Sequence, residues 1–198
     1  MIPDYQRAAD MAYRTLTSLK ISTLPIDPLM ILQKCKNTSI HTFDELMERF
    51  GVNDPFDFKT LDLAWAEAFT IRKTIGNRVI HELFYDSSVR TPRGRFTLAH
   101  ELGHIVLNHS CEEAWEEKEA NHYAAQLLAP RPVLTIFSIF GYDITDPKFV
   151  AKAFRISKSA AEIAANPRSD FEMNDLYRSV ADQFIAYVES CSPFSDAV

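Results

Sequence analysis

The stretch RGRFTLAHELGH, residues Arg93 to His104, decides how the rest of the chain is interpreted. It holds an H-E-x-x-H pattern, in which His100, Glu101 and His104 lie within a helix predicted over Arg95 to His109. Histidines four residues apart lie one turn apart on the same helix face, so both imidazoles can bind one ion. Glu101 lies beside that face, where a carboxylate can accept a proton from water. The pattern predicts metal-assisted hydrolysis with zinc, or another divalent ion in its place.

The residues that follow the motif exclude one kind of zinc site. A metzincin-like continuation would have glycine at position 107 and histidine at position 110, but these are Leu107 and Ser110. His109 is nine residues from His100, on the opposite side of a continuous helix, so it is not expected to share the ion. A third ligand must therefore come from further along the chain.

The next predicted helix, over Glu112 to Leu128, supplies that ligand. Glu117 and Asn121 fall on one face, so a ligating carboxylate would be followed by an amide able to hold a ligating imidazole through its other nitrogen. Glu113 and Glu119 are the alternatives. Glu119 points to the other side of the helix from Asn121, and Glu113 leaves little chain for the reversal between the helices. Glu117 is the favoured ligand.

Two segments together resemble the ImmA/IrrE family of metallopeptidases. RGRFTLAHELGH resembles the family's R-x-R-F-T-x-A-H-E-x-G-H segment, and EKEANHYAAQLLAP, Glu117 to Pro130, resembles its E-x-x-A-N-x-F-A-A-x-L-L-M-P segment. Tyr123 stands for the usual Phe and Ala129 for the usual Met, which leaves the ligands untouched. LPIDPLMIL, Leu24 to Leu32, is similar to the family's N-terminal helix, and the resemblance covers roughly residues 20 to 135.

The resemblance implies a gluzincin-like zinc site, with His100, His104 and Glu117 as ligands and Glu101 as general base. It also implies an edge strand against which a substrate lies extended, for which RVIHELFY, Arg78 to Tyr85, is the candidate. Family members are bacterial or phage proteins that cleave helix-turn-helix repressors and so release stress or mobile-element genes. The alternative function is a non-catalytic metal-binding module that regulates a repressor or a toxin–antitoxin partner.

The expected fold is α+β: a small sheet with an edge strand packs on a helical, zincin-like core, and the C-terminal part is all helical. Strands are predicted over 38–43, 64–73 and 78–85, and Ala120, Ala124 and Ala125 should let the two site helices approach closely. The whole chain, 1–198, is predicted to be a single metallopeptidase domain, with a core over about 20–135 and a helical subdomain over 136–198.

Composition excludes several partners. The 198 residues carry 21 basic and 27 acidic side chains, a net charge of -6, which argues against nucleic acid and against an anionic membrane surface. No signal peptide is recognisable, and three widely spaced cysteines indicate free thiols in a reducing compartment. A cytoplasmic protein is expected, with a protein substrate as its partner.

The acidic excess is concentrated in one stretch. Residues 110–119 hold five glutamates and one lysine, a local charge of -4, which leaves -2 for the remainder of the chain. This stretch leads into the predicted ligand helix. Its negative charge would attract a divalent cation and would interact favourably with the positive end of the helix dipole. The charge distribution therefore points to the metal site.

No residue stands out as the group that stabilises the oxyanion of a peptide-cleaving transition state. Six side chains near the motifs are candidates, each with a surface or packing role as the simpler interpretation. They are Tyr85, Arg93, Arg95, His109, His122 and Tyr123.

Overall fold

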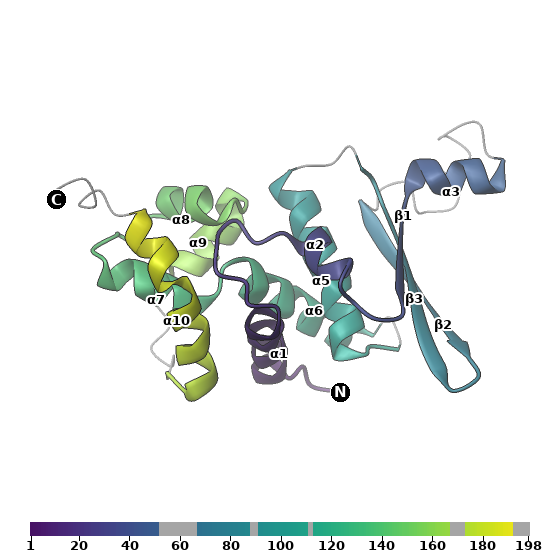
Figure 1. Ribbon diagram of the computed structural model, residues 1–198, viewed down its shortest axis with the longest axis horizontal. Helices are drawn as coiled ribbons and strands as arrows, with labels where there is room; N and C mark the ends of the chain where they lie inside the picture. Colours follow the sequence, from purple (N-terminus) through teal and green to yellow (C-terminus); the bar gives the residue numbers. More distant parts are fainter. Residues whose placement is uncertain (52–66, 88–90, 111–112, 167–172, 192–198) are drawn as a thin grey trace.

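The computed structural model describes residues 1–51, 67–87, 91–110, 113–166 and 173–191 (Figure 1). Within them the chain has the predicted α+β fold, a small sheet with helices making up most of the rest. In chain order the elements are α1 (Tyr5–Ser18), α2 (Pro28–Leu32), β1 (Thr38–Thr42), α3 (Phe43–Phe50), β2 (Ala68–Ile75), β3 (Arg78–Tyr85), α5 (Pro92–Leu107), α6 (Ala114–Leu128), α7 (Arg131–Ile139), α8 (Pro147–Phe154), α9 (Lys158–Ala165) and α10 (Asp175–Ser190).

The sheet has the strand order β1-β3-β2. β2 and β3 form an antiparallel hairpin that closes on the pair Ile75 and Arg78, and Gly76 in its turn has a φ of 60°, which favours glycine. β1 pairs with the other side of β3 in parallel, from Thr38 opposite His81 to Thr42 opposite Tyr85. The sheet is therefore mixed, and β3 is its central strand.

The prediction that RVIHELFY is an edge strand is wrong. This segment is β3, and it has a hydrogen-bonded neighbour on each side. Leu83 and Phe84, which point to opposite faces of the sheet, are both buried, as is typical of a strand inside a sheet. Among the described strands the edges are β1 and β2, and β2 is the one that packs beside α5.

The helices α5 and α6 lie between the sheet and the C-terminal helices (Figure 1). α1 packs on α6, and α10 packs on both α1 and α7, so the N-terminal and C-terminal helices cover the same region. The buried apolar side chains form one cluster that runs from Ala8 in α1 to Val188 in α10. This core holds the two site helices in fixed positions.

The metal-site helix begins earlier than predicted, at Pro92 and not at Arg95. The Thr91 hydroxyl accepts a hydrogen bond from the Gly94 N–H at 3.2 Å, and Pro92 occupies the first helical position, where its missing N–H costs nothing. Thr91 is therefore the N-cap of this helix.

Within the described residues, no helix combines the length and the apolar character needed to span a bilayer. Cys35 and Cys191 are free thiols in the part of the chain that the structure describes, and Cys111 lies outside it.

Candidate metal centre

Three predicted ligand side chains converge between α5 and α6. The Nε2 atoms of His100 and His104 lie 3.0 Å apart on one face of α5. The Glu117 carboxylate from α6 lies 3.3 Å from the first Nε2 and 3.2 Å from the second. All three ligand atoms lie within 4.8 Å of one another. The sequence spacing and the fold thus place one carboxylate against two imidazole nitrogens.

The donor set fits a zinc ion. Ligand atoms about 2.0–2.1 Å from a tetrahedral ion are about 3.3 Å from each other, close to the separations found here. Two imidazole nitrogens and one carboxylate oxygen are borderline ligands of the kind that zinc takes at catalytic sites. In the described residues the group contains these three ligands and no fourth, which leaves a coordination position for water or substrate.

The two helices meet because small residues line their contact. A Cβ added at Gly103 would lie 3.2 Å from the Ala120 backbone and 3.1 Å from the Tyr123 ring, so glycine is needed at this crossing. Ala120 and Ala124 are fully buried there, as predicted. Ala125, predicted to join them, is exposed. The close approach brings Glu117 within reach of the imidazoles.

Asn121 holds the first ligand as expected. His100 Nδ1 lies 3.0 Å from Asn121 Oδ1. If Nε2 binds a metal ion, His100 carries its proton on Nδ1 and donates a hydrogen bond to the amide oxygen. Such a contact fixes the tautomer and the ring orientation of a metal ligand.

A buried chain of side chains holds the second ligand. His104 Nδ1 lies 3.1 Å from His109 Nδ1, and His109 Nε2 lies 3.2 Å from a Glu119 carboxylate oxygen. The tautomers agree: His104 donates to His109, and His109 donates to Glu119. The side chains of His109 and Glu119 are each only 2% exposed. The carboxylate thus orients His104 through one intervening imidazole.

Helix α1 completes this chain. Arg7 Nη1 lies 3.1 Å from the Glu119 carboxylate, and the Asp4 N–H donates to its other oxygen at 2.8 Å. Arg7 Nη2 also donates to the Leu107 carbonyl at the end of α5, at 2.7 Å. These contacts satisfy a buried charge and tie the N-terminal helix to the metal centre.

The pKa of His104 is lowered to about 4, chiefly by burial and in part by the neighbouring imidazoles of His100 and His109. The imidazole is therefore neutral at pH 7, the form that binds a metal ion.

The sequence offered His109 only as an oxyanion candidate. Its contact with His104 was not predicted, because the predicted helix was two residues too long. α5 ends at Leu107, and Asn108 adopts a left-handed conformation with a φ of 56°. The chain therefore turns back, and the His109 N–H donates to the His104 carbonyl at 3.0 Å. Asparagine is frequent at this position after a helix, so Asn108 was the signal for the turn.

The competing carboxylates have structural roles. Glu113 precedes the first residue of α6 and accepts a hydrogen bond from Trp115 Nε1 at 2.5 Å. Glu119 lies on the buried side of α6, and so does Glu116, which accepts from the Ser110 N–H at 3.0 Å. Among the described glutamates of the acidic stretch, Glu117 alone joins the ligand group. The local charge thus serves packing as well as the metal centre.

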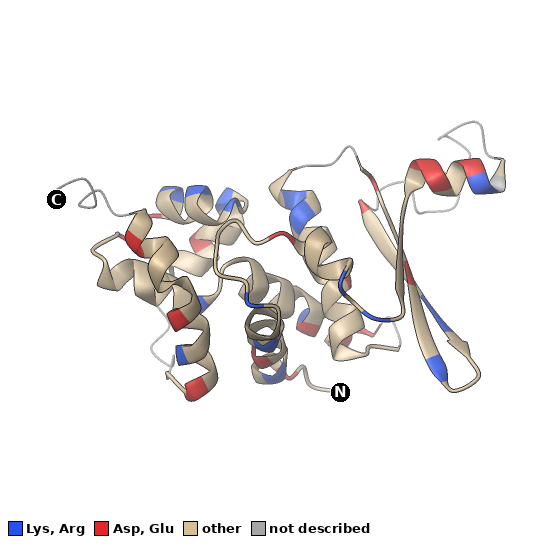
Figure 2. Cartoon of the chain, viewed as in Figure 1, with Lys and Arg blue, Asp and Glu red and all other residues tan. Residues whose placement is uncertain are grey.

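Both arginine candidates for the oxyanion contact are engaged by other groups. Figure 2 shows the first turns of α5 in blue, where Arg93 and Arg95 lie. Arg95 donates to the carbonyls of Ile26 and Phe154, which clamps α5 to distant segments. Arg93 pairs with Glu67 at 3.3 Å.

The remaining three candidates, Tyr123, Tyr85 and His122, have contacts of their own. Tyr123 is fully buried, and its hydroxyl lies 3.0 Å from the Thr15 hydroxyl. Tyr85 is half-buried at the end of β3 and packs against the core. His122 contacts the Tyr5 ring, with ring centroids 5.1 Å apart. None of these contacts marks an oxyanion-stabilising group.

Glu101 is half-buried on α5, next to His100 in the chain. It is not one of the three grouped ligands, in keeping with a role other than metal binding.

Comparison with known proteins bears on the same residues. A family model described as an IrrE N-terminal-like domain, Peptidase_M78, matches residues 64–166, which is more than half of the chain and includes α5 and α6. No curated protein matches the chain. The resemblance seen in the two motifs is thereby confirmed at the level of the family. The chain belongs to the Peptidase_M78 family of ImmA/IrrE-type peptidases.

Proposed function

We propose that this protein is a zinc-dependent endopeptidase that cuts a helix-turn-helix repressor, in a stress response or in the control of a mobile element or phage. The observation that carries the proposal is the convergence of His100, His104 and Glu117 beside Glu101. A purely structural zinc site would gain nothing from such a carboxylate and would be closed by a fourth protein ligand.

The proposed chemistry divides between the ion and the chain. A bound zinc ion supplies Lewis acidity, acting on water and on the peptide carbonyl. Glu101 accepts the proton of the attacking water and passes it to the leaving amine, so one carboxylate serves first as base and then as acid. His100, His104 and Glu117 fix the position of the reaction relative to Glu101.

The substrate segment is proposed to lie along the outer edge of β2, beside which no other strand lies in the part of the chain that the structure describes. Asp86 N–H donates to the Glu67 carbonyl at 2.9 Å, so alternate residues from Glu67 onward point their main-chain groups toward β3. The intervening residues, Thr70 and Arg72 among them, turn their N–H and C=O groups to the open side. Near α5, Thr97 Oγ1 donates to Glu67 at 3.2 Å, which anchors the start of this edge to the metal-site helix. An extended peptide can add there as a further strand.

Replacing Arg72 by proline should lower cleavage of a protein substrate by about tenfold, because it removes one outward-facing N–H that the added strand would use. The ladder with β3 does not use that N–H, so the melting temperature should change little. Arg72→Ala is the matched control, since it removes the same side chain and keeps the N–H. Equal rates for Arg72→Pro and Arg72→Ala would contradict docking at this edge.

The function is tested with the helix-turn-helix protein encoded beside this gene as substrate. Zinc-loaded protein should cut it at one position, detected by intact mass, and a chelator should stop the reaction until zinc is restored. A helix-turn-helix protein from an unrelated operon is the control. An uncut neighbour in the presence of stoichiometric zinc would contradict the proposed substrate.

A further inference from the structure

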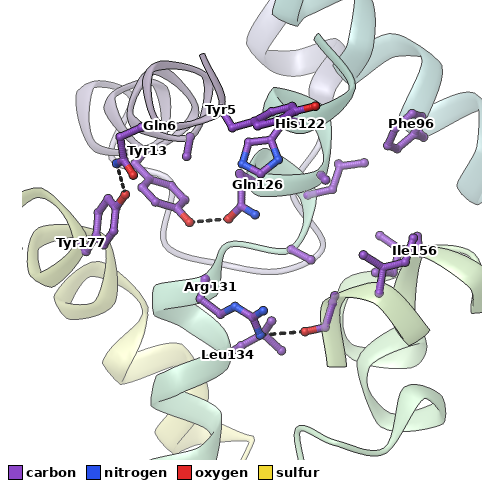
Figure 3. Close-up of a pocket in the computed structure, with 17 residues that line it drawn as sticks. Tyr5, Gln6, Tyr13, Phe96, His122, Gln126, Arg131, Leu134, Ile156 and Tyr177 are labelled. Carbon is purple, nitrogen blue, oxygen red and sulfur yellow. Dashed lines mark hydrogen bonds between the residues drawn. The ribbon is translucent and has the colours of Figure 1, made fainter. Parts of the chain in front are cut away.

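A groove lies between α6 and α9, close to the metal centre. It consists of two adjoining cavities, with volumes of about 820 Å³ and about 310 Å³, that share Phe96, His122 and Ile163 among their lining residues. Figure 3 shows the smaller one, with Tyr5 beside His122 on one side and Ile156 across the opening. The larger volume is within the range of about 300–1,000 Å³ typical of ligand sites.

The walls of the groove are apolar and open to solvent. Phe96, Ile156 and Ala160 line both cavities. Ile163 is 67% exposed and Tyr5 is 47% exposed, so two large apolar side chains stand at its rim. Ala125, which the close helix contact does not use, forms part of its floor. Exposed apolar surface that lines a concavity is characteristic of a binding site.

The groove borders the candidate metal centre. Asn121 lines the larger cavity and is hydrogen-bonded to His100. Lys118, which also lines it, directly follows the ligand Glu117. A polypeptide bound at the metal would therefore place residues on one side of the scissile bond in this groove.

The charge of the groove is opposite to that of the whole chain. Among the described residues that line the two cavities there are three cations, Arg93, Lys118 and Arg131, and no carboxylate. Of these, Arg93 is 78% exposed and is also paired with Glu67, which does not line the groove. The chain as a whole carries a net charge of -6. Arg131 is held at the inner end by the carbonyls of Ala164 and Asn166, each at 2.9 Å. Such a lining complements a ligand that is both apolar and acidic.

We propose that this groove, the α6–α9 groove, binds a segment of the protein substrate in which aromatic or branched aliphatic side chains alternate with carboxylates, next to the bond that is cut. The apolar side chains enter between Phe96 and Ile163, and the carboxylates face Arg93 and Lys118. The inference rests on the proposed peptidase function and adds to it the chemistry of the recognised segment.

The test measures binding without cleavage. The probe is a fluorescein-labelled decapeptide in which three glutamates alternate with a phenylalanine and a leucine. Zinc-loaded Glu101→Gln protein is titrated into it, and binding is followed by fluorescence anisotropy. Two control peptides replace the glutamates by lysines, or the two apolar residues by serines. The acidic apolar probe should bind about tenfold more tightly than either control. Its advantage over the lysine peptide should shrink in about 1 M salt, where charges are screened beyond about 3 Å.

Variants of exposed groove residues locate the binding. Lys118→Glu and Ala125→Asp, made in the Glu101→Gln protein, should each weaken binding of the probe by about five- to tenfold, because each adds negative charge beside its carboxylates. Lys152→Glu on α8, the same charge change at an exposed site outside the groove, should leave the affinity unchanged.

The outcomes separate this inference from the proposed function. Equal affinity for the three peptides, or unchanged affinity in both Lys118→Glu and Ala125→Asp, overturns the groove assignment even if the native protein cleaves its substrate. If the Glu101→Gln protein shows the expected preference but the native protein never cleaves a substrate, the groove assignment is supported and the proposed peptidase function is contradicted.

Discussion

Replacing Glu101 by glutamine should lower the rate of substrate cleavage by about 10²–10⁴-fold while the bound zinc is retained, because the amide cannot accept the proton of the attacking water. Glutamine has nearly the shape of glutamate, so α5 and the three ligands should keep their positions. The measurements are the initial rate on the repressor substrate and the zinc content of the same preparation. Loss of activity with full zinc content assigns Glu101 to the chemical step.

The control for this prediction is Glu48→Gln, the same change at an exposed position on α3. It should leave both rate and zinc content unaltered. Undiminished cleavage by Glu101→Gln would contradict the role of general base. Zinc binding by the native protein without any cleavage would instead favour the regulatory metal-binding module.

The ligand group was predictable because its geometry is local. His100 and His104 are related by one turn of one helix, and Glu117 and Asn121 by one turn of the next. Periodicity assigned each pair to a face, and the observed contacts of 3.0–3.3 Å follow from those faces meeting. The sequence did not show how α5 and α6 are oriented relative to each other.

What could not be predicted depends on contacts between distant segments. The position of β3 in the sheet is decided by β1, some 40 residues earlier, and periodicity within Arg78 to Tyr85 cannot identify that neighbour. Arg7 reaches Glu119 across 112 residues, and nothing in either local pattern joins them. The groove is likewise formed by α6 and α9, and two other helices, α7 and α8, lie between them in the sequence.

Removing both imidazole ligands, as His100→Ala with His104→Ala, should reduce bound zinc from about one ion per chain to nearly none and abolish cleavage, because a lone carboxylate cannot hold the ion. The fold should survive, since α5 is also held by its Arg95 clamp and by buried Leu98 and Leu102. Zinc content by atomic absorption and helix content by circular dichroism separate the two effects. Zinc retained by the double variant would contradict the site.

The buried chain behind His104 predicts a graded effect from Glu119→Gln. The change keeps the size of the side chain and removes the charge that His109 and Arg7 contact. Outer contacts of this kind orient a ligand and raise its basicity, so zinc affinity should fall by about 10–100-fold. Competition with a chromophoric chelator measures this directly.

A variant of a histidine outside the site tests whether zinc binding depends on the ligand histidines in particular. His41 stacks on Phe84 in the sheet and contacts none of the ligands, so His41→Ala should bind zinc as the native protein does. If affinity follows the order native and His41→Ala, then Glu119→Gln, then the double ligand variant, the ion is held by α5 and α6 and the carboxylate acts through His109. If Glu119→Gln binds zinc as tightly as the native protein, the buried chain serves only to anchor α1, and His104 is positioned by helix packing alone.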